Sequence, residues 1–123
     1  RLLRNLLSNA VEHGEGKPIV VEVGANAQAV AVCVTDQGVG MTKQQLERIF
    51  DRFWRADPAR QRSVGGTGLG LAISKEDAIL HRGWLQVWSK PNRGSCFRLT
   101  LPISAAAVIS NSPLPLPPKT MEG

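Results

Sequence analysis

Two asparagines, Asn5 and Asn9, lie four residues apart in the first segment of the chain. If that segment is helical, the two carboxamides stack on the same face of the helix. Neutral carboxamide oxygens suit Mg²⁺, which takes few protein ligands and completes its coordination with water and substrate phosphates. Taken alone, however, the pair is better explained as two solvent-facing side chains on a polar helix face.

A carboxylate and two glycines, Asp36, Gly38 and Gly40, follow directly after an apolar stretch. A carboxylate at the end of a buried strand is held rigidly at the floor of a pocket. There it can accept a hydrogen bond from an exocyclic amine such as that of adenine. Glycine has no Cβ, so the backbone can approach a flat ring closely. An ordinary turn containing Asp has the same pattern, which is therefore weakly specific by itself.

A glycine-rich stretch, Gly-Thr-Gly-Leu-Gly at residues 66–70, opens an expected helix. Unpaired backbone N–H groups and the positive end of a helix dipole would there face an anion. The spacing differs from the G-x-G-x-x-G dinucleotide fingerprint, and no Gly-Lys-Ser/Thr of a Walker A loop follows. A phosphate-binding turn of another kind and a flexible hinge are the two interpretations that remain.

Three aromatic residues, Phe50, Phe53 and Trp54, begin a basic segment that extends to about residue 66. Loops of this length in compact domains are usually functional. The aromatic side chains would fasten the segment to the body of the protein, and its arginines could then reach phosphate oxygens. The alternative is that the aromatic residues simply belong to the core.

The periodicity of the apolar residues predicts the elements that position these motifs. Helices are expected over residues 1–13, 43–50 and 69–81, and strands over residues 19–23, 29–35, 84–88 and 96–101. Thr42 is expected to cap the second helix, with Gln45 as its capping-box partner. The Pro-rich sequence from residue 103 onward predicts a flexible tail with polyproline II character.

The composition limits the possible classes of protein. A chain of 123 residues and 13.3 kDa forms one small domain, and a hydrophobic content of 42% excludes wholesale disorder. Cys33 and Cys96 are too few for a disulfide framework or a four-ligand zinc site, and are expected to fill the core. A net charge of +5 favours a polyanionic partner, such as a nucleotide, an acidic protein face or anionic lipid.

The order and spacing of the motifs together resemble the ATP-binding catalytic domain of two-component sensor histidine kinases. These kinases belong to the superfamily of gyrase, Hsp90, histidine kinase and MutL ATPases. Residues 4–13 are similar to the N box of the family, 36–40 to the G1 box, 49–54 to the F box and 66–70 to the G2 box. Within the family, the chain looks most like the actinobacterial MtrB-type sensor kinases.

The resemblance implies an α+β fold: a two-layer α/β sandwich of the Bergerat type with a mixed, mostly antiparallel sheet. Helices would cover one face of the sheet, and a long ATP lid would span residues 41–65. Residues 1–102 would form the catalytic domain, truncated at its N-terminus to start at the N box. Residues 103–123 would be the Pro-rich flexible tail.

The resemblance also implies roles for individual residues. Asn9 would be the principal Mg²⁺ ligand with Asn5 beside it, Asp36 would bind the adenine amine, and Arg55 would contact the γ-phosphate. The implied catalytic residues are Asn5, Asn9 and Arg55. The implied binding residues for the cofactors ATP and Mg²⁺ are Asn5, Asn9, Asp36, Gly38, Gly40, Phe50, Arg55, Gly66, Thr67, Gly68, Leu69 and Gly70.

Two departures from the family pattern bear on the reaction. Many sensor kinases have Lys and Tyr where this chain has Glu12 and His13, so a phosphate-clamping contact is lost. His13 lies within the N box and His81 ends an expected helix, so neither is expected to be the phosphoacceptor. The expected reaction is therefore transfer of the γ-phosphoryl group of Mg-ATP to a histidine on a separate dimerisation domain.

The expected partners are ATP, that dimerisation and histidine phosphotransfer domain and, indirectly, a response regulator receiver domain. No nucleic acid partner and no membrane contact by this chain are expected, and its expected location is the cytoplasmic side of a plasma-membrane sensor kinase. Two alternatives stay open. One is an ATPase of the same superfamily, although such enzymes need a catalytic Glu about where Asn5 stands. The other is a nucleotide-sensing module without enzymatic activity.

Overall fold

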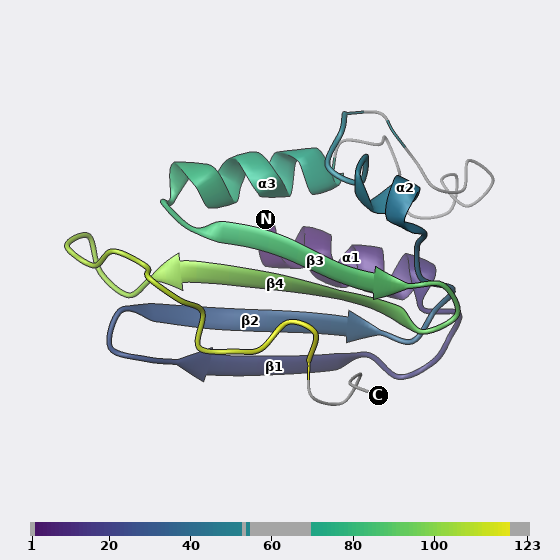
Figure 1. Ribbon diagram of the computed structural model, residues 1–123, viewed down its shortest axis with the longest axis horizontal. Coiled ribbons are helices and arrows are strands. Elements are labelled where there is room, and N and C mark those ends of the chain that lie inside the picture. Colours follow the sequence, from purple (N-terminus) through teal and green to yellow (C-terminus); the bar gives the residue numbers. More distant parts are fainter. Residues whose placement is uncertain (1, 53, 55–69, 119–123) are drawn as a thin grey trace.

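The computed structural model describes residues 2–52, 54 and 70–118. Its elements in chain order are α1 (Leu2–His13), β1 (Val20–Ala25), β2 (Ala29–Asp36), α2 (Lys43–Leu46), α3 (Gly70–Leu80), β3 (Trp84–Lys90) and β4 (Gly94–Pro102). The strands form one sheet in the order β1-β2-β4-β3. Figure 1 shows this sheet with α1 behind it and the C-terminal segment passing in front of β2. The α+β fold predicted from the sequence is confirmed.

Every pairing among the described strands is antiparallel. The sequence predicts a mixed, mostly antiparallel sheet. The described part of the chain contains antiparallel pairs and no parallel pair. The central strands β2 and β4 carry nearly continuous apolar or small residues because both of their faces are covered. The edge strand β1 is more exposed, and its burial alternates over most of its length.

The helices cover one face of the sheet and enclose the core with it. Leu6 and Ala10 are the buried residues of α1 and lie one helical turn apart. They pack against side chains from the helix-facing side of the strands and from α3. The buried core cluster consists of Leu6, Ala10, Val34, Met41, Ala78, Leu85, Phe97 and Leu99. Each fully buried Leu or Phe contributes about 1.5–3 kcal/mol relative to an exposed position.

The second helix is shorter than the sequence predicts. The predicted capping box is present, because the Thr42 side chain accepts from the Gln45 N–H and the Gln45 side chain accepts from the Thr42 N–H. The α-helix nevertheless ends at Leu46 instead of extending to residue 50. The N–H groups of Arg48 and Asp51 each bond to the carbonyl three residues earlier, so the chain continues as tighter turns.

The C-terminal segment differs most from its prediction. Residues 103–118, here called the C-terminal strap, lie along the sheet face opposite the helices instead of forming a free flexible tail (Figure 1). The Arg98 guanidinium donates to the Leu114 carbonyl at 2.7 Å, and the hydroxyls of Thr100 and Ser112 lie 2.8 Å apart. At Gly24, an added Cβ would come within 2.8 Å of the Leu114 side chain. Small residues on this face therefore let the strap lie close to the sheet.

The strap side of the sheet also contains the two cysteines. Cys33 and Cys96 are both free and buried, as expected of residues that fill the core. In the described part of the chain, no helix is both long enough and apolar enough to span a membrane.

Candidate functional site

The N-box asparagines lie on α1 and are both half-buried. The Asn5 Nδ2 donates to the carbonyl oxygen of Gly70 at 3.4 Å, and Gly70 is the first residue of α3. Because the amide nitrogen makes this contact, the Asn5 Oδ1 can still accept a hydrogen bond or coordinate a metal ion. The N box and the last residue of the G2 box, 65 positions apart in the chain, are therefore neighbours.

Asp36 ends the central strand β2 and is 2% exposed. Its Oδ1 accepts the Gly38 N–H at 2.9 Å, and the Ser95 N–H also bonds to the carboxylate. Burial is the largest influence on the pKa of Asp36 and raises it above its ordinary value. The two N–H groups and the nearby His13 partly offset that increase. The side chain is therefore a rigidly held acceptor at the end of a buried strand, as predicted.

The glycines of the G1 box lie in close contact with protein backbone. A Cβ at Gly38 would lie 1.7 Å from the His13 carbonyl oxygen, and a Cβ at Gly40 would lie 1.9 Å from the Lys90 carbonyl oxygen. Gly40 also has a φ of +68°, which L side chains rarely adopt. The described contacts thus explain both glycines by close packing of protein backbone, between the end of α1 and the β3–β4 turn.

The F-box aromatic Phe50 is half-buried and packs against the core cluster, a position that fits both interpretations of the aromatic residues. Its ring meets Phe97 edge-to-face, with centroids 6.4 Å apart and an interplanar angle of 82°. The Lys75 Nζ lies 5.1 Å from the Phe50 centroid and donates to the Leu85 carbonyl at 2.8 Å. Sequence reasoning did not identify Lys75, because its partners are distant in the chain and belong to different elements.

Part of the predicted site lies outside the described residues. This holds for Arg55, Gly66, Thr67, Gly68 and Leu69, and for all of the predicted lid beyond residue 52 except Trp54. Gly70 is described, as the first residue of α3. The structure therefore places the end of α1, the helix that bears Asn5 and Asn9, against Asp36 and Gly38, and bonds Asn5 to Gly70.

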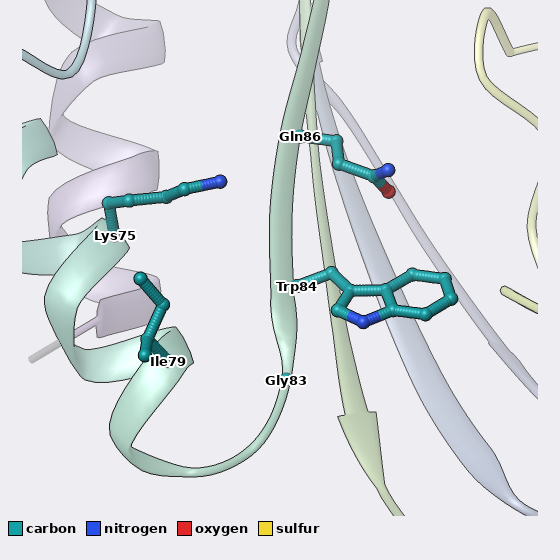
Figure 2. Close-up of a pocket in the computed structure, with 5 residues that line it drawn as sticks. All are labelled: Lys75, Ile79, Gly83, Trp84 and Gln86. Atoms are coloured by element: carbon teal, nitrogen blue, oxygen red, sulfur yellow. The ribbon is translucent and has the colours of Figure 1, made fainter. Parts of the chain in front are cut away.

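A pocket of about 350 Å³ lies at the exposed edge of β3 and involves none of the predicted site residues. Figure 2 shows Lys75 and Ile79 of α3 on one side of β3, and Trp84 and Gln86 on the other side. The pocket thus wraps around a strand edge instead of being enclosed. Its lining residues lie outside the sequence motifs, although one of them, Lys75, also contacts Phe50 of the F box.

Comparison with known families and sequences gives consistent matches. Residues 1–105 match the family model described as "Histidine kinase-, DNA gyrase B-, and HSP90-like ATPase". Sensor histidine kinase MtrB of Mycolicibacterium paratuberculosis is 53% identical over 118 residues, which are 96% of this chain and 21% of the relative. Sensor-like histidine kinase SenX3 of Mycobacterium tuberculosis is 45% identical over 101 residues, 81% of this chain and 25% of the relative. The chain spans about a fifth of the length of the MtrB relatives that it matches.

Two solved structures share the fold of this chain. Full-length ShkA in complex with AMPPNP matches with a TM-score of 0.72 and 29% identity, over 87% of this chain and 22% of that chain. The mycobacterial sensor histidine kinase MprB matches with a TM-score of 0.67 and 29% identity, over 82% of this chain and 67% of that chain.

Proposed function

Because the chain belongs to the family of histidine kinase-, DNA gyrase B- and HSP90-like ATPases, we propose that it binds Mg-ATP and donates the γ-phosphoryl group to a histidine on a separate domain. The matches confirm the resemblance to sensor histidine kinases, including those of the MtrB type. The observation that carries the proposal is the convergence of the buried Asp36 carboxylate with α1. The Gly38 backbone lies against the His13 carbonyl at the end of the helix that bears Asn5 and Asn9.

In this proposal Asp36 recognises the base. An ionised, rigidly held carboxylate accepts a hydrogen bond from the adenine amine and offers no donor to a base that presents a carbonyl there. The N–H groups of Gly38 and Ser95 hold the carboxylate in place, so little reorganisation is needed when the nucleotide binds.

The α1 asparagines fit a magnesium ion by their chemistry. They are two half-buried neutral oxygen donors one turn apart, and the Asn5 amide is oriented by its bond to Gly70. Asn9 would hold Mg²⁺ with Asn5 beside it, and the ion would spread the charge of the transferring phosphoryl group. By resemblance, Arg55 would contact the γ-phosphate, and residues 66–70 would bind phosphates through backbone N–H groups.

The acceptor histidine belongs to a partner in this proposal. His13 is half-buried and its Nε2 lies 3.9 Å from the Glu12 carboxylate, while His81 follows the end of α3. The proposed partners are a dimerisation and histidine phosphotransfer domain and, through it, a response regulator receiver domain. We place the domain on the cytoplasmic side of a membrane sensor kinase, with the nucleotide site within residues 1–102.

Calorimetric titration with AMPPNP, with and without Mg²⁺, tests nucleotide binding. The expected result is one bound nucleotide per chain, with affinity that depends on Mg²⁺. Asn9→Ala should remove the Mg²⁺ dependence and leave the fold intact, whereas Ser8→Ala, a half-buried control on the same helix, should leave binding unchanged. Absence of AMPPNP binding to the unaltered chain would contradict the proposal.

Transfer is tested with radiolabelled ATP and a separately expressed dimeric domain that carries the acceptor histidine. The mixture should give slow labelling that is labile to acid and stable to base, because the tether that provides effective concentration is missing. The same acceptor domain with its histidine replaced by alanine should stay unlabelled. The chain alone should neither label itself nor hydrolyse ATP appreciably. Rapid hydrolysis by the chain alone would favour the ATPase alternative instead.

A further inference from the structure

The buried hydroxyl of Ser89 in β3 makes three hydrogen bonds, two with backbone groups and one with another side chain. The residue is 7% exposed, and its Oγ accepts the Met41 N–H at 2.8 Å. The same hydroxyl donates its proton to the Gly94 carbonyl at 2.8 Å, and its oxygen lies 2.8 Å from the Ser95 Oγ. Because a hydroxyl has one proton, donation to Gly94 makes Ser89 an acceptor for both other groups. The hydroxyl is therefore fully used.

This hydroxyl holds the far end of the loop that begins at Asp36. Residues 36–41 pass between the end of α1 and the β3–β4 turn, and the Met41 side chain lies in the core. The Asn92 N–H donates to the Val39 carbonyl at 2.6 Å, which adds a second attachment between loop and turn. Ser95, hydrogen-bonded to Ser89, is also paired with Asp36 across β2 and β4. Ser89 is thus linked to both ends of the loop.

We propose that Ser89 is a positioning residue for recognition of the nucleotide base, and this inference depends on the proposed function. Its hydroxyl fixes the 36–41 loop against the β3–β4 turn, so that the Asp36 carboxylate keeps the orientation in which it meets an exocyclic amine. Without the hydroxyl, the buried Met41 N–H loses its side-chain partner and the Gly94 carbonyl loses a donor. A buried polar group without a partner is costly, so the loop moves to restore its bonds.

The test compares the binding of two ligands by a Ser89 variant and by a matched control variant. Ser89→Ala should weaken AMPPNP binding about five- to fiftyfold, the equivalent of one or two lost buried hydrogen bonds. Binding of tripolyphosphate, which has no base, should change less than about twofold. Thr100→Val is the matched control, since it removes another buried hydroxyl with a 2.8 Å hydrogen bond, on the strap side of β4. It should change neither affinity.

A second variant covers the case in which Ser89→Ala does not fold. Ser89→Cys replaces the hydroxyl by a somewhat larger thiol that forms much weaker hydrogen bonds, and it should show the same selective loss. Hydrogen exchange of the Met41 amide should be faster in either variant than in the unaltered chain. Equal weakening for both ligands, or unchanged AMPPNP affinity, would overturn the inference.

The two hypotheses fail in distinguishable ways. If the unaltered chain binds no AMPPNP, the proposed function fails, and with it the base-recognition role of Ser89. If the unaltered chain binds AMPPNP but Ser89→Ala and Ser89→Cys bind it equally well, only the Ser89 inference fails.

Discussion

Asp36 is subject to two opposing influences at the residue scale. Burial disfavours its charged form and raises its pKa, whereas two backbone N–H groups and the nearby His13 stabilise the charge. Such a carboxyl is held in one orientation in a site with little water. Its acceptor capacity therefore has more effect on a bound base than that of an exposed carboxylate.

Asp36→Asn should weaken AMPPNP binding by about 1–3 kcal/mol, because a charge-assisted acceptor is replaced by a neutral amide that also carries donors. Calorimetry with AMPPNP and with tripolyphosphate measures the effect, and only the nucleotide should be affected. The exposed carboxylate Glu47 provides a control, since Glu47→Gln makes the same change of charge at a residue outside the four motifs. Equal losses for both ligands would mean that Asp36 does not contact the base.

The raised pKa of Asp36 also predicts how stability depends on pH. The folded protein holds this proton more tightly than the unfolded chain, in which the pKa of Asp is about 3.9. The resulting stabilisation is complete below the unfolded pKa and is lost as the pH rises through the folded pKa. Asp36→Asn should remove this part of the pH dependence of the unfolding free energy, measured by urea unfolding at a series of pH values. Parallel curves for the two proteins would contradict the expectation.

At the scale of elements, α3 connects the motifs of the site. The carbonyl of its first residue accepts a hydrogen bond from the Asn5 amide. Two consecutive residues further along the helix contact residues of the F box. Lys75 contacts Phe50 and the Leu85 carbonyl, while the Glu76 carboxylate lies 2.6 Å from the Arg52 guanidinium. The Arg52–Glu76 pair is exposed and contributes little by itself, so Lys75 is the more important contact.

Lys75→Met should lower the free energy of unfolding by about 1–3 kcal/mol. The substitution keeps much of the apolar stem but removes a charged hydrogen bond to Leu85 and a cation–π contact with Phe50. Urea unfolding measures the change, and Lys43→Met on the exposed side of α2 is the matched control. Lys75→Arg, which keeps the charge, should lose less. Identical stability of the two Met variants would show that the Lys75 contacts do not matter.

At the scale of the whole molecule, the sheet is covered on both faces. The helices enclose the larger core, and the C-terminal strap covers small and polar residues on the opposite face. Thr100 is fully buried and hydrogen-bonded to the strap, and Cys33 and Cys96 are buried on that side. The match to MtrB extends over 118 of the 123 residues and therefore includes the strap.

Removal of residues 103–123 should destabilise the protein by about 2–4 kcal/mol, because several side-chain hydrogen bonds are lost and buried surface is exposed. Thermal and urea unfolding measure the loss, and the thiols of Cys33 and Cys96 should react faster with a thiol reagent. Removal of residues 119–123 alone is the control and should change stability little. If both truncated chains match the full chain in stability and thiol reactivity, the strap does not contribute to the fold.

Local features of the protein could be predicted from the sequence alone. The apolar repeat of α1, the capping box of Thr42 and Gln45 and the strand patterns depend on residues within a few positions of one another. The position of Asp36 after a buried strand follows from the same local pattern. The motif order then indicated the family, since each motif is short and continuous in the chain.

Only the tertiary structure determined why the G1 glycines are needed, how the strap packs, and which side chains hold the site together. Gly38 meets the carbonyl of His13, Lys75 meets Phe50, and the Ser89 hydroxyl meets the Met41 amide. Such contacts join residues far apart in the chain and depend on strand register and on the angle at which elements pack. The Pro-rich strap shows the same limit, because its composition predicts an extended chain but contains no information about the sheet face that binds it.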